Sequence, residues 1–520
     1  MMRGRAWPLG LALMLGLPAA LAAPSAAGNR APVLDVQAGD YLQGQWIPAQ
    51  VPATLSLHDD QGHLIRRWQA AEPGAQTLRV QATAAGRWQA EVAASDQLQF
   101  APAVGLGQQM PLPAGPDPVT PPRSPRLQQL ARQLQQLARQ LQQGASTDAF
   151  WEQVAAAGGT LREPIGQQWL LTFLWRGARH SAAVWAGPDG DLSPMQRLDG
   201  SDVWYASFPV PADTFMSYQL VPDQPRPAGD RRSQRQALLA VAQADPHNRQ
   251  RWGGQDADRF AQRSIVHLPA APSMPVPARR TGLWQQRWVS DPLSGQTRQL
   301  SLYRSAGGQG EPVELVLFDA HAFDALVDAP GVIQALVDAG RLPPLQVVLV
   351  GNASTGSRST ELACDERTAQ ALVEHWLPAL DDLRWPLPAT RRVIAGASLG
   401  GLAATCAALA QPQQFGHVLA LSPSYWWAPP GEAANALSRR VPAAGQAPTL
   451  RVFAGAFEQG RAGQPGIAPA SQTVVQAWQQ AGLPARLQLY SGGHDWYAWR
   501  WALAEGLQQL FPADAAGAIQ

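Results

Sequence analysis

A serine flanked by glycines is the first feature of this 520-residue chain that indicates chemistry. The segment Gly396-Ala397-Ser398-Leu399-Gly400 follows a short apolar run at 392–395 and precedes a run at 402–409 that is typical of a helix. A strand, a sharp turn with a central serine and a helix together form a nucleophile elbow. The glycines give room for a strained backbone at the serine. The pattern therefore predicts that Ser398 is a nucleophile.

A serine hydroxyl is a weak nucleophile and needs a neighbouring base. Two histidines follow Ser398, and His417 opens an apolar strand, where a structural role is expected. His494 follows the strand-like run 487–490 and is the predicted base. In the chain order serine, acid, histidine, the acid is then Glu458, because it is the one acidic residue between Glu432 and His494. The alternative for Glu458 is a surface position, with another acid or a dyad completing the site.

Acyl transfer also requires hydrogen-bond donors for a tetrahedral oxyanion. The backbone N–H of Leu399 comes with the elbow. A second donor is expected from the loop after the strand-like run 313–317, at Ala320 or His321, and His321 has direct contact with substrate as its alternative role. We find no metal-binding spacing, P-loop or dinucleotide fingerprint in the sequence, so neither a metal nor a cofactor is expected.

The elements that must position these residues alternate between strand and helix from about residue 271 onward. This alternation predicts a mostly parallel sheet with helices on both faces, and thus an α/β-hydrolase catalytic domain over 271–515. Such sheets place their sites beyond the carboxyl ends of the strands. The expected strands are 313–318, 347–350, 393–395, 418–421, 450–454 and 487–490.

Two β-sandwich-like regions are predicted before the catalytic domain. Residues 30–100 form short alternating runs with a turn at 59–62, which indicates a small all-β module for binding or spacing. Residues 101–145 combine a Pro-rich linker with an amphipathic helix that packs on its own protein or pairs in a dimer. Residues 146–270 are β-rich again. The sequence leaves the oligomeric state open between monomer and dimer.

The start of the chain reads as a secretion signal over residues 1–22, with two arginines, an apolar stretch and a small-residue cleavage site. We therefore expect a periplasmic protein without a membrane span, with a retained N-terminal anchor as the alternative. The formal net charge of +1 gives no support for nucleic-acid binding. Export makes a disulfide between Cys364 and Cys406 one interpretation, and two buried thiols remain the other.

Residues 165–510 resemble the enterochelin (enterobactin) esterase family. The likeness rests on Leu171-Thr172-Phe173-Leu174-Trp175-Arg176, Gly200-Ser201-Asp202-Val203-Trp204-Tyr205, Tyr218-Gln219-Leu220, Ala244-Asp245-Pro246-His247-Asn248, Arg358-Ser359-Thr360-Glu361-Leu362, the elbow, Phe415-Gly416-His417 and Ser422-Pro423-Ser424-Tyr425-Trp426-Trp427. The resemblance implies hydrolysis of the ester bonds of a tri-catecholate siderophore, ferric or apo. It places Ser398, His494 and Glu458 in the triad. The signal sequence and the first β module depart from the family's cytoplasmic pattern.

Three further residues are candidates for binding such an anionic, aromatic substrate. Arg358 either binds the negative charge of the substrate or forms a structural ion pair with Glu361. Trp426 and Trp427 stack on catechol rings, or Trp427 packs in the core. Two alternative functions remain at this level, namely an exported carboxylesterase for acetyl or feruloyl groups and a siderophore-binding protein with weak catalysis.

Overall fold

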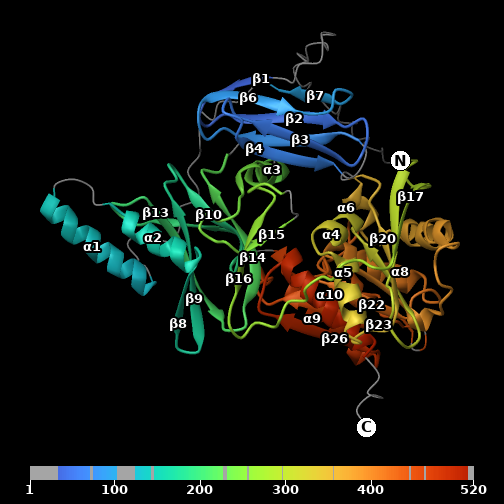
Figure 1. Ribbon diagram of the computed structural model, residues 1–520. Coiled ribbons are helices and arrows are strands. Elements are labelled where there is room, and N and C mark those ends of the chain that lie inside the picture. Colours follow the sequence, from blue (N-terminus) through green and yellow to red (C-terminus); the bar gives the residue numbers. More distant parts are fainter. Residues whose placement is uncertain are drawn as a thin grey trace, which may run out of the picture.

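The computed structural model describes residues 33–70, 74–101, 123–141, 146–225, 231–253, 257–295, 297–354, 357–443, 445, 447–461 and 464–512. The predicted signal sequence at 1–22 and most of the predicted linker lie outside these residues. Figure 1 shows three regions along the chain: a blue β module above, and below it a green β-domain beside a catalytic domain coloured yellow to red.

The first β module consists of two antiparallel sheets, as its alternating pattern predicts. Their orders are β1-β6-β3-β4 and β5-β2-β7. The turn at 59–62 joins β3 to β4, and Gly62 takes the positive φ of 81° that this tight turn requires. The strands are β1 (Val33–Val36), β2 (Tyr41–Ile47), β3 (Ala53–His58), β4 (Leu64–Ala70), β5 (Gln76–Gln81), β6 (Gly86–Glu91) and β7 (Gln97–Phe100).

The predicted amphipathic helix is α1 (Pro125–Leu141), and α2 (Asp148–Ala157) follows it. Leu127 and Leu130 of α1 are buried in a cluster with Trp151 and Val154 of α2. These two leucines of the apolar face of α1 therefore pack against their own chain.

The second β region pairs a five-stranded sheet, β11-β10-β14-β16-β15, with a four-stranded sheet, β12-β13-β9-β8. Helix α3 packs on the outer side of this domain, beneath the first module (Figure 1). The elements are β8 (Leu161–Ile165), β9 (Gln168–Arg176), β10 (Ala182–Gly187), β11 (Gly190–Pro194), β12 (Gln196–Arg197), β13 (Val203–Pro211), β14 (Phe215–Pro222), α3 (Arg231–Val241), β15 (Arg251–Trp252) and β16 (Arg263–His267).

The catalytic domain contains an eight-stranded sheet in the order β17-β18-β20-β19-β21-β22-β23-β26. The last six strands are parallel and include all six predicted strands, whereas β17 and β18 form an antiparallel edge that the sequence pattern did not reveal. The strands of this sheet are β17 (Leu283–Ser290), β18 (Thr297–Arg304), β19 (Val313–Phe318), β20 (Leu345–Val350), β21 (Arg392–Ala397), β22 (His417–Leu421), β23 (Thr449–Gly455) and β26 (Ala485–Tyr490). The short strands β24 (Gly460–Arg461) and β25 (Gln464–Pro465) pair with each other in a separate sheet.

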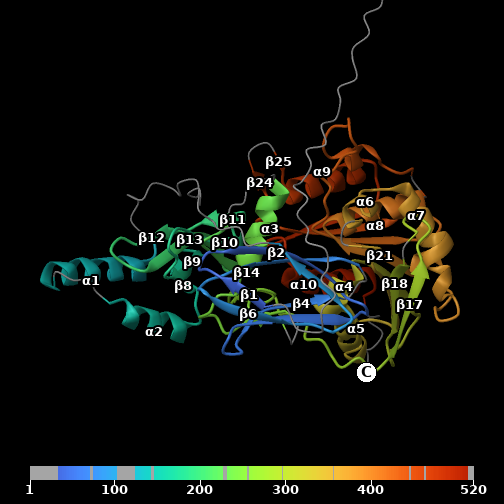
Figure 2. The same cartoon turned by 90° about the horizontal axis from the view of Figure 1, so that it is seen from above.

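Helices cover both faces of this sheet, as the α/β-hydrolase prediction requires (Figure 2). Alternate residues of β19 face α5 and α10 on one side and α8 on the other. The helices are α4 (Ala320–Ala325), α5 (Ala329–Asp338), α6 (Arg358–Glu361), α7 (Glu366–Ala371), η1 (Leu372–Trp376), η2 (Pro378–Leu380), η3 (Ala389–Arg391), α8 (Leu399–Ala410), η4 (Ala436–Arg439), α9 (Ile467–Gln480) and α10 (Trp496–Leu510).

Candidate active site

Ser398 sits between the end of β21 and the start of α8, with φ of 58° and ψ of −121°. A non-glycine residue is strained at this positive φ. The surrounding glycines make the turn possible, since a Cβ on Gly396 would lie 2.4 Å from the Gly400 backbone. The five-residue pattern therefore forms the elbow that the sequence predicts.

Neighbouring strands hold this strained residue in place. The Ser398 N–H donates to the Leu421 carbonyl at 2.9 Å, and the Ser398 carbonyl accepts from the Ser424 N–H at 2.9 Å. The hydroxyl oxygens of Ser398 and Ser424 are 3.3 Å apart. These contacts fix the backbone of the elbow against the loop that follows β22.

Glu458 and His494 come together from the loops after β23 and β26. The Glu458 Oε1 atom is 2.6 Å from His494 Nδ1. A carboxylate in this position accepts the Nδ1 proton and leaves Nε2 as the basic nitrogen of the ring. The Glu458 side chain is 6% exposed, so the surface position considered for it is wrong.

The second carboxylate oxygen of Glu458 is also bound. Its Oε2 accepts from the Ser422 hydroxyl and from the Gly455 N–H, each at 2.7 Å. The same hydroxyl oxygen accepts from Trp499 Nε1 at 3.0 Å and is 3.1 Å from the Tyr490 hydroxyl. Burial, together with the nearby Glu458 carboxylate, raises the pKa of Tyr490, so its phenol keeps its proton. This network orients the Glu458 carboxylate toward His494.

The loop that carries His494 is tied to the β-domain. The Ser491 carbonyl accepts from the Phe215 N–H at 3.0 Å. Asp495, which caps α10, accepts from the Ser217 N–H at 2.9 Å and from the Tyr497 N–H at 2.6 Å. Strand β14 therefore buttresses both sides of His494, from a domain that shares no sheet with it.

The N-termini of α4 and α8 meet at the carboxyl ends of the adjacent strands β19 and β21. The first amides of a helix have no acceptor within that helix, which applies to Leu399 of α8 and to Ala320 and His321 of α4. A Cβ on Gly400 would lie 3.0 Å from the Asp319 carboxylate, which shows how close the two turns are. The two predicted sources of oxyanion donors, the N-termini of α4 and α8, therefore lie close together at this end of the sheet.

Two cavities, of about 580 and 410 Å³, open at this site. Ser398 and His494 line both, as do Trp185, Arg235 and Arg263 of the β-domain. His321, Arg358 and two indoles, Trp496 and Trp499, line the larger cavity. The arrangement offers a nucleophile and a base between walls rich in cationic and aromatic groups.

Arg358 lies on the larger cavity but does not pair with Glu361. Its guanidinium forms a two-point ion pair with Asp319, at 2.5 and 2.7 Å, and Glu361 instead binds Arg298 at 2.7 Å. The proposed Arg358–Glu361 pair is therefore wrong. Asp319 directly follows β19 and lies 39 positions before Arg358, so local spacing could not predict this pair.

The two adjacent tryptophans divide between the cavity and the core. Trp426 is 41% exposed and lines the smaller cavity. Trp427 is half-buried and packs against the hydrophobic core beside α8, as its alternative role anticipated. His417 lies at the amino end of β22, opposite the end that leads to Ser422, and its Nε2 contacts the Thr390 carbonyl at 3.0 Å.

Sequence reasoning missed residues that hold or surround the site. Ser422 and Asp319 each directly follow a parallel strand, and that position at the active end of the sheet was an available signal. Gln69, Gln76, Trp185 and Arg235 line the cavities from other domains, and no local pattern marks them.

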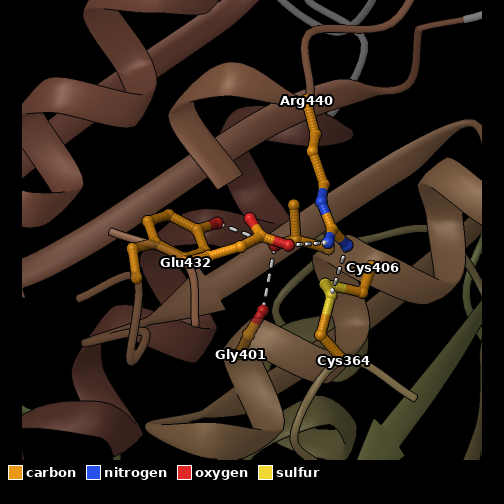
Figure 3. The surroundings of a disulfide bond; sticks show 7 residues. Cys364, Gly401, Cys406, Glu432 and Arg440 are labelled. Carbon is orange, nitrogen blue, oxygen red and sulfur yellow. Dashed lines mark hydrogen bonds and ion pairs between the residues drawn. A yellow bond between two sulfur atoms is a disulfide. The ribbon is translucent and has the colours of Figure 1, made fainter. Parts of the chain in front are cut away.

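Cys364 and Cys406 form a disulfide, which settles the choice left open by the sequence. Figure 3 shows this bond beside Arg440, whose guanidinium approaches the Cys364 sulfur at 3.8 Å and also pairs with Glu432. Because Cys406 lies on α8, the bond ties the helix that begins at the elbow to the segment before α7.

Within the described ranges no cluster of His, Cys, Asp or Glu has a metal-binding arrangement. Across the same ranges, the helices include none that is long and apolar enough to cross a bilayer.

Comparisons with known proteins agree with this geometry. Residues 170–276 match the family described as "Enterochelin esterase, N-terminal", and residues 294–510 match "Putative esterase". The iron(III) enterobactin esterase of Dickeya dadantii is 31% identical over 71% of this chain and 94% of its own length. The corresponding enzyme of Escherichia coli K12 is 30% identical over 61% and 81%. The enterobactin esterase of Shigella flexneri, solved in the presence of enterobactin, has 26% identity and a TM-score of 0.57, covering 71% of this chain and 99% of that one.

Proposed function

We propose a siderophore esterase activity for this chain, which belongs to the enterochelin esterase family. The protein is a carboxylic ester hydrolase. The proposed substrates are the ester bonds of a tri-catecholate trilactone such as enterobactin, with or without iron. The observation that carries the proposal is the Glu458–His494 contact of 2.6 Å, placed beside an elbow serine on the same two cavities.

In the proposed mechanism, Ser398 is the nucleophile and His494 Nε2 removes its proton as the hydroxyl attacks the ester carbonyl. Glu458 holds the imidazole by Nδ1 and stabilises the imidazolium that forms. The oxyanion accepts from the Leu399 N–H and from a second amide at Ala320 or His321. The ester C–O bond then breaks, and the imidazolium gives its proton to the alkoxide oxygen that leaves. His494 next removes a proton from water, which attacks the acyl-enzyme, and the imidazolium returns a proton to Ser398 Oγ as the carboxylic acid is released.

The cavity walls suit a ferric tri-catecholate, which is bulky, aromatic and anionic. Arg235 lies 4.8 Å above the Trp185 ring, and both line the two cavities that Ser398 also lines. Arg358 adds a cation and Trp426 an exposed indole. Charge-assisted hydrogen bonds and ring stacking are the contacts that catecholates offer. We also propose that the chemistry takes place in the periplasm, on the basis of the signal-like sequence at 1–22.

The test is mass spectrometry of enterobactin, apo and ferric, incubated with the wild type and with Ser398→Ala. The wild type should open the trilactone, and the variant should lose at least about 10⁴-fold in rate, since triad members act as a unit. Ser438→Ala is the matched control, because Ser438 lies on η4 and its hydroxyl donates to the Asn435 carbonyl. Equal amounts of product from the wild type and from Ser398→Ala would refute the assignment of Ser398 as the nucleophile. An intact trilactone alongside rapid hydrolysis of acetyl or feruloyl esters would refute the substrate.

A further inference from the structure

The first β module reaches the catalytic cavity, although the family match begins only at residue 170. Two of its glutamines, Gln69 at the end of β4 and Gln76 at the start of β5, line the same cavity as Ser398 and His494. We propose that Gln69 and Gln76 form a distal subsite that binds a remote arm of the multi-armed ester substrate. This inference rests on the proposed function and deepens it.

The module is docked by specific contacts on the β-domain. The Arg66 guanidinium donates to the Ala240 carbonyl at 2.7 Å and stacks over the Phe260 ring at 4.4 Å. The Arg67 N–H donates to the Asp258 carboxylate at 2.6 Å. Burial lowers the pKa of Arg66 to about 10, which reflects how completely this contact excludes water. These contacts fix β4 against the β-domain at Arg66 and Arg67, three and two residues before Gln69.

Strand β5 is anchored on the helix that forms part of the cavity wall. Arg79 of β5 donates to the Gln236 side chain of α3 at 2.8 Å. The next residue before Gln236, Arg235, lines the cavity, as does Leu239 one turn later. Tyr41 of β2 is 1% exposed and packs against two alanines of α3. Gln76 and the α3 residues Arg235 and Leu239 thus line the same cavity. Figure 1 shows α3 directly beneath the first module.

The chemistry of this wall fits the periphery of a tri-catecholate rather than its reacting ester. A glutamine amide donates to catecholate oxygens and accepts from catechol hydroxyls or amide N–H groups. It does so without a charge, so it serves ferric and apo forms alike. With one ester at Ser398, the other arms of a trilactone must extend into the surrounding cavity. We expect a small ester that fills only the space next to Ser398 to make no contact with Gln69 or Gln76.

The experiment compares enterobactin with p-nitrophenyl acetate as substrates of the full chain. Gln69→Ala/Gln76→Ala should raise KM for the trilactone about tenfold, the effect expected for two lost hydrogen bonds. Its kcat/KM for the acetate should stay within about twofold of the wild type. Gln81→Ala is the matched control, because Gln81 ends the same strand β5 but lines a separate cavity. The control variant should have the wild-type kinetic constants for both substrates.

A charge variant sharpens the test. Gln69→Glu/Gln76→Glu places two carboxylates beside an anionic ligand, so KM for the trilactone should rise further, and added salt should reduce the effect. The subsite proposal would be overturned if both double variants kept the wild-type KM for the trilactone. It would also be overturned if kcat/KM fell equally for the two substrates. Failure of the wild type itself to cleave the trilactone would instead refute the proposed function, so the two failures are distinct.

Discussion

The Ser217 N–H donates to the Asp495 carboxylate at 2.9 Å, and this bond joins the β-domain to the residue next to His494. The two residues are 278 positions apart in the chain. The β-domain therefore acts on the active site in two ways, because it lines both cavities and also fixes the loop that carries the proposed base.

Asp495 gives a prediction on stability and pH. Burial raises its pKa above the usual range, against the opposing effect of Arg263 and three backbone N–H donors. A raised pKa in the folded state means that its contribution to stability is complete below the unfolded pKa and is lost as the pH rises through the folded pKa. The stability of Asp495→Asn relative to wild type should therefore increase from about pH 4 toward neutrality.

The measurement is thermal unfolding of both proteins over that pH range. Because asparagine has one acceptor oxygen where aspartate has two, the variant carries a constant penalty at every pH. The slope of the difference is what tests the prediction. A difference that does not change with pH would contradict it.

Ser422 is predicted to matter for both stability and rate. Ser422→Ala removes a donor to Glu458 and leaves Trp499 Nε1 without its partner in a fully buried site. An unsatisfied buried group costs about 1–3 kcal/mol, and a loosened Glu458 should lower kcat more than it changes KM. Urea unfolding and steady-state kinetics measure the two effects. Ser438→Ala, whose hydroxyl donates to the Asn435 carbonyl and not to Glu458, is the comparison. Equal losses of kcat in both variants would argue against this role.

Arg358 should bind substrate and stabilise the fold at once. Arg358→Ala leaves the Asp319 carboxylate, which is 5% exposed, without its two-point partner. The loss of stability should be smaller than the cost of about 3–5 kcal/mol for removing one member of a fully buried pair, because the Arg358 side chain is 32% exposed. Arg358→Ala/Asp319→Ala should recover most of that stability but keep a raised KM for the anionic trilactone. If the double variant recovered wild-type KM as well, Arg358 would have a purely structural role.

The disulfide between Cys364 and Cys406 should stabilise the catalytic domain. The residues it joins are 42 positions apart, and the chain-entropy estimate for such a loop is about 4 kcal/mol. Cys364→Ser/Cys406→Ser should lower Tm, and reduction of the wild type with dithiothreitol should lower it equally. If dithiothreitol also lowered the Tm of the double variant, its effect on the wild type would not come from this bond.

The sequence predicted those parts of the fold that depend on local pattern. The six parallel strands, the elbow, and the positions of Glu458 and His494 follow from apolar runs and the residues directly after them. The edge strands β17 and β18 were missed because neither has a continuous apolar run. The residues of β17 are exposed or half-buried, and β18, although mostly buried, mixes polar residues with apolar ones. The partner of Arg358 was predicted wrongly because Asp319 lies 39 positions away in the chain, beyond the reach of local spacing.

The contributions of other domains to the cavities could not be predicted. Gln69 and Gln76 lie 329 and 322 residues before Ser398, and whether they reach the same cavity depends on how the first module docks on α3. Docking of this kind is decided by surface complementarity between folded units, and no periodicity within one segment encodes it.

The first module is a self-contained pair of sheets held on α3 by side-chain and backbone contacts at its surface. Such a unit can be gained, lost or exchanged in evolution without moving Ser398, Glu458 or His494. Ligand preference and bond cleavage are then free to diverge at different speeds. For protein engineering, Gln69 and Gln76 become the positions at which to alter selectivity while the catalytic residues stay unchanged.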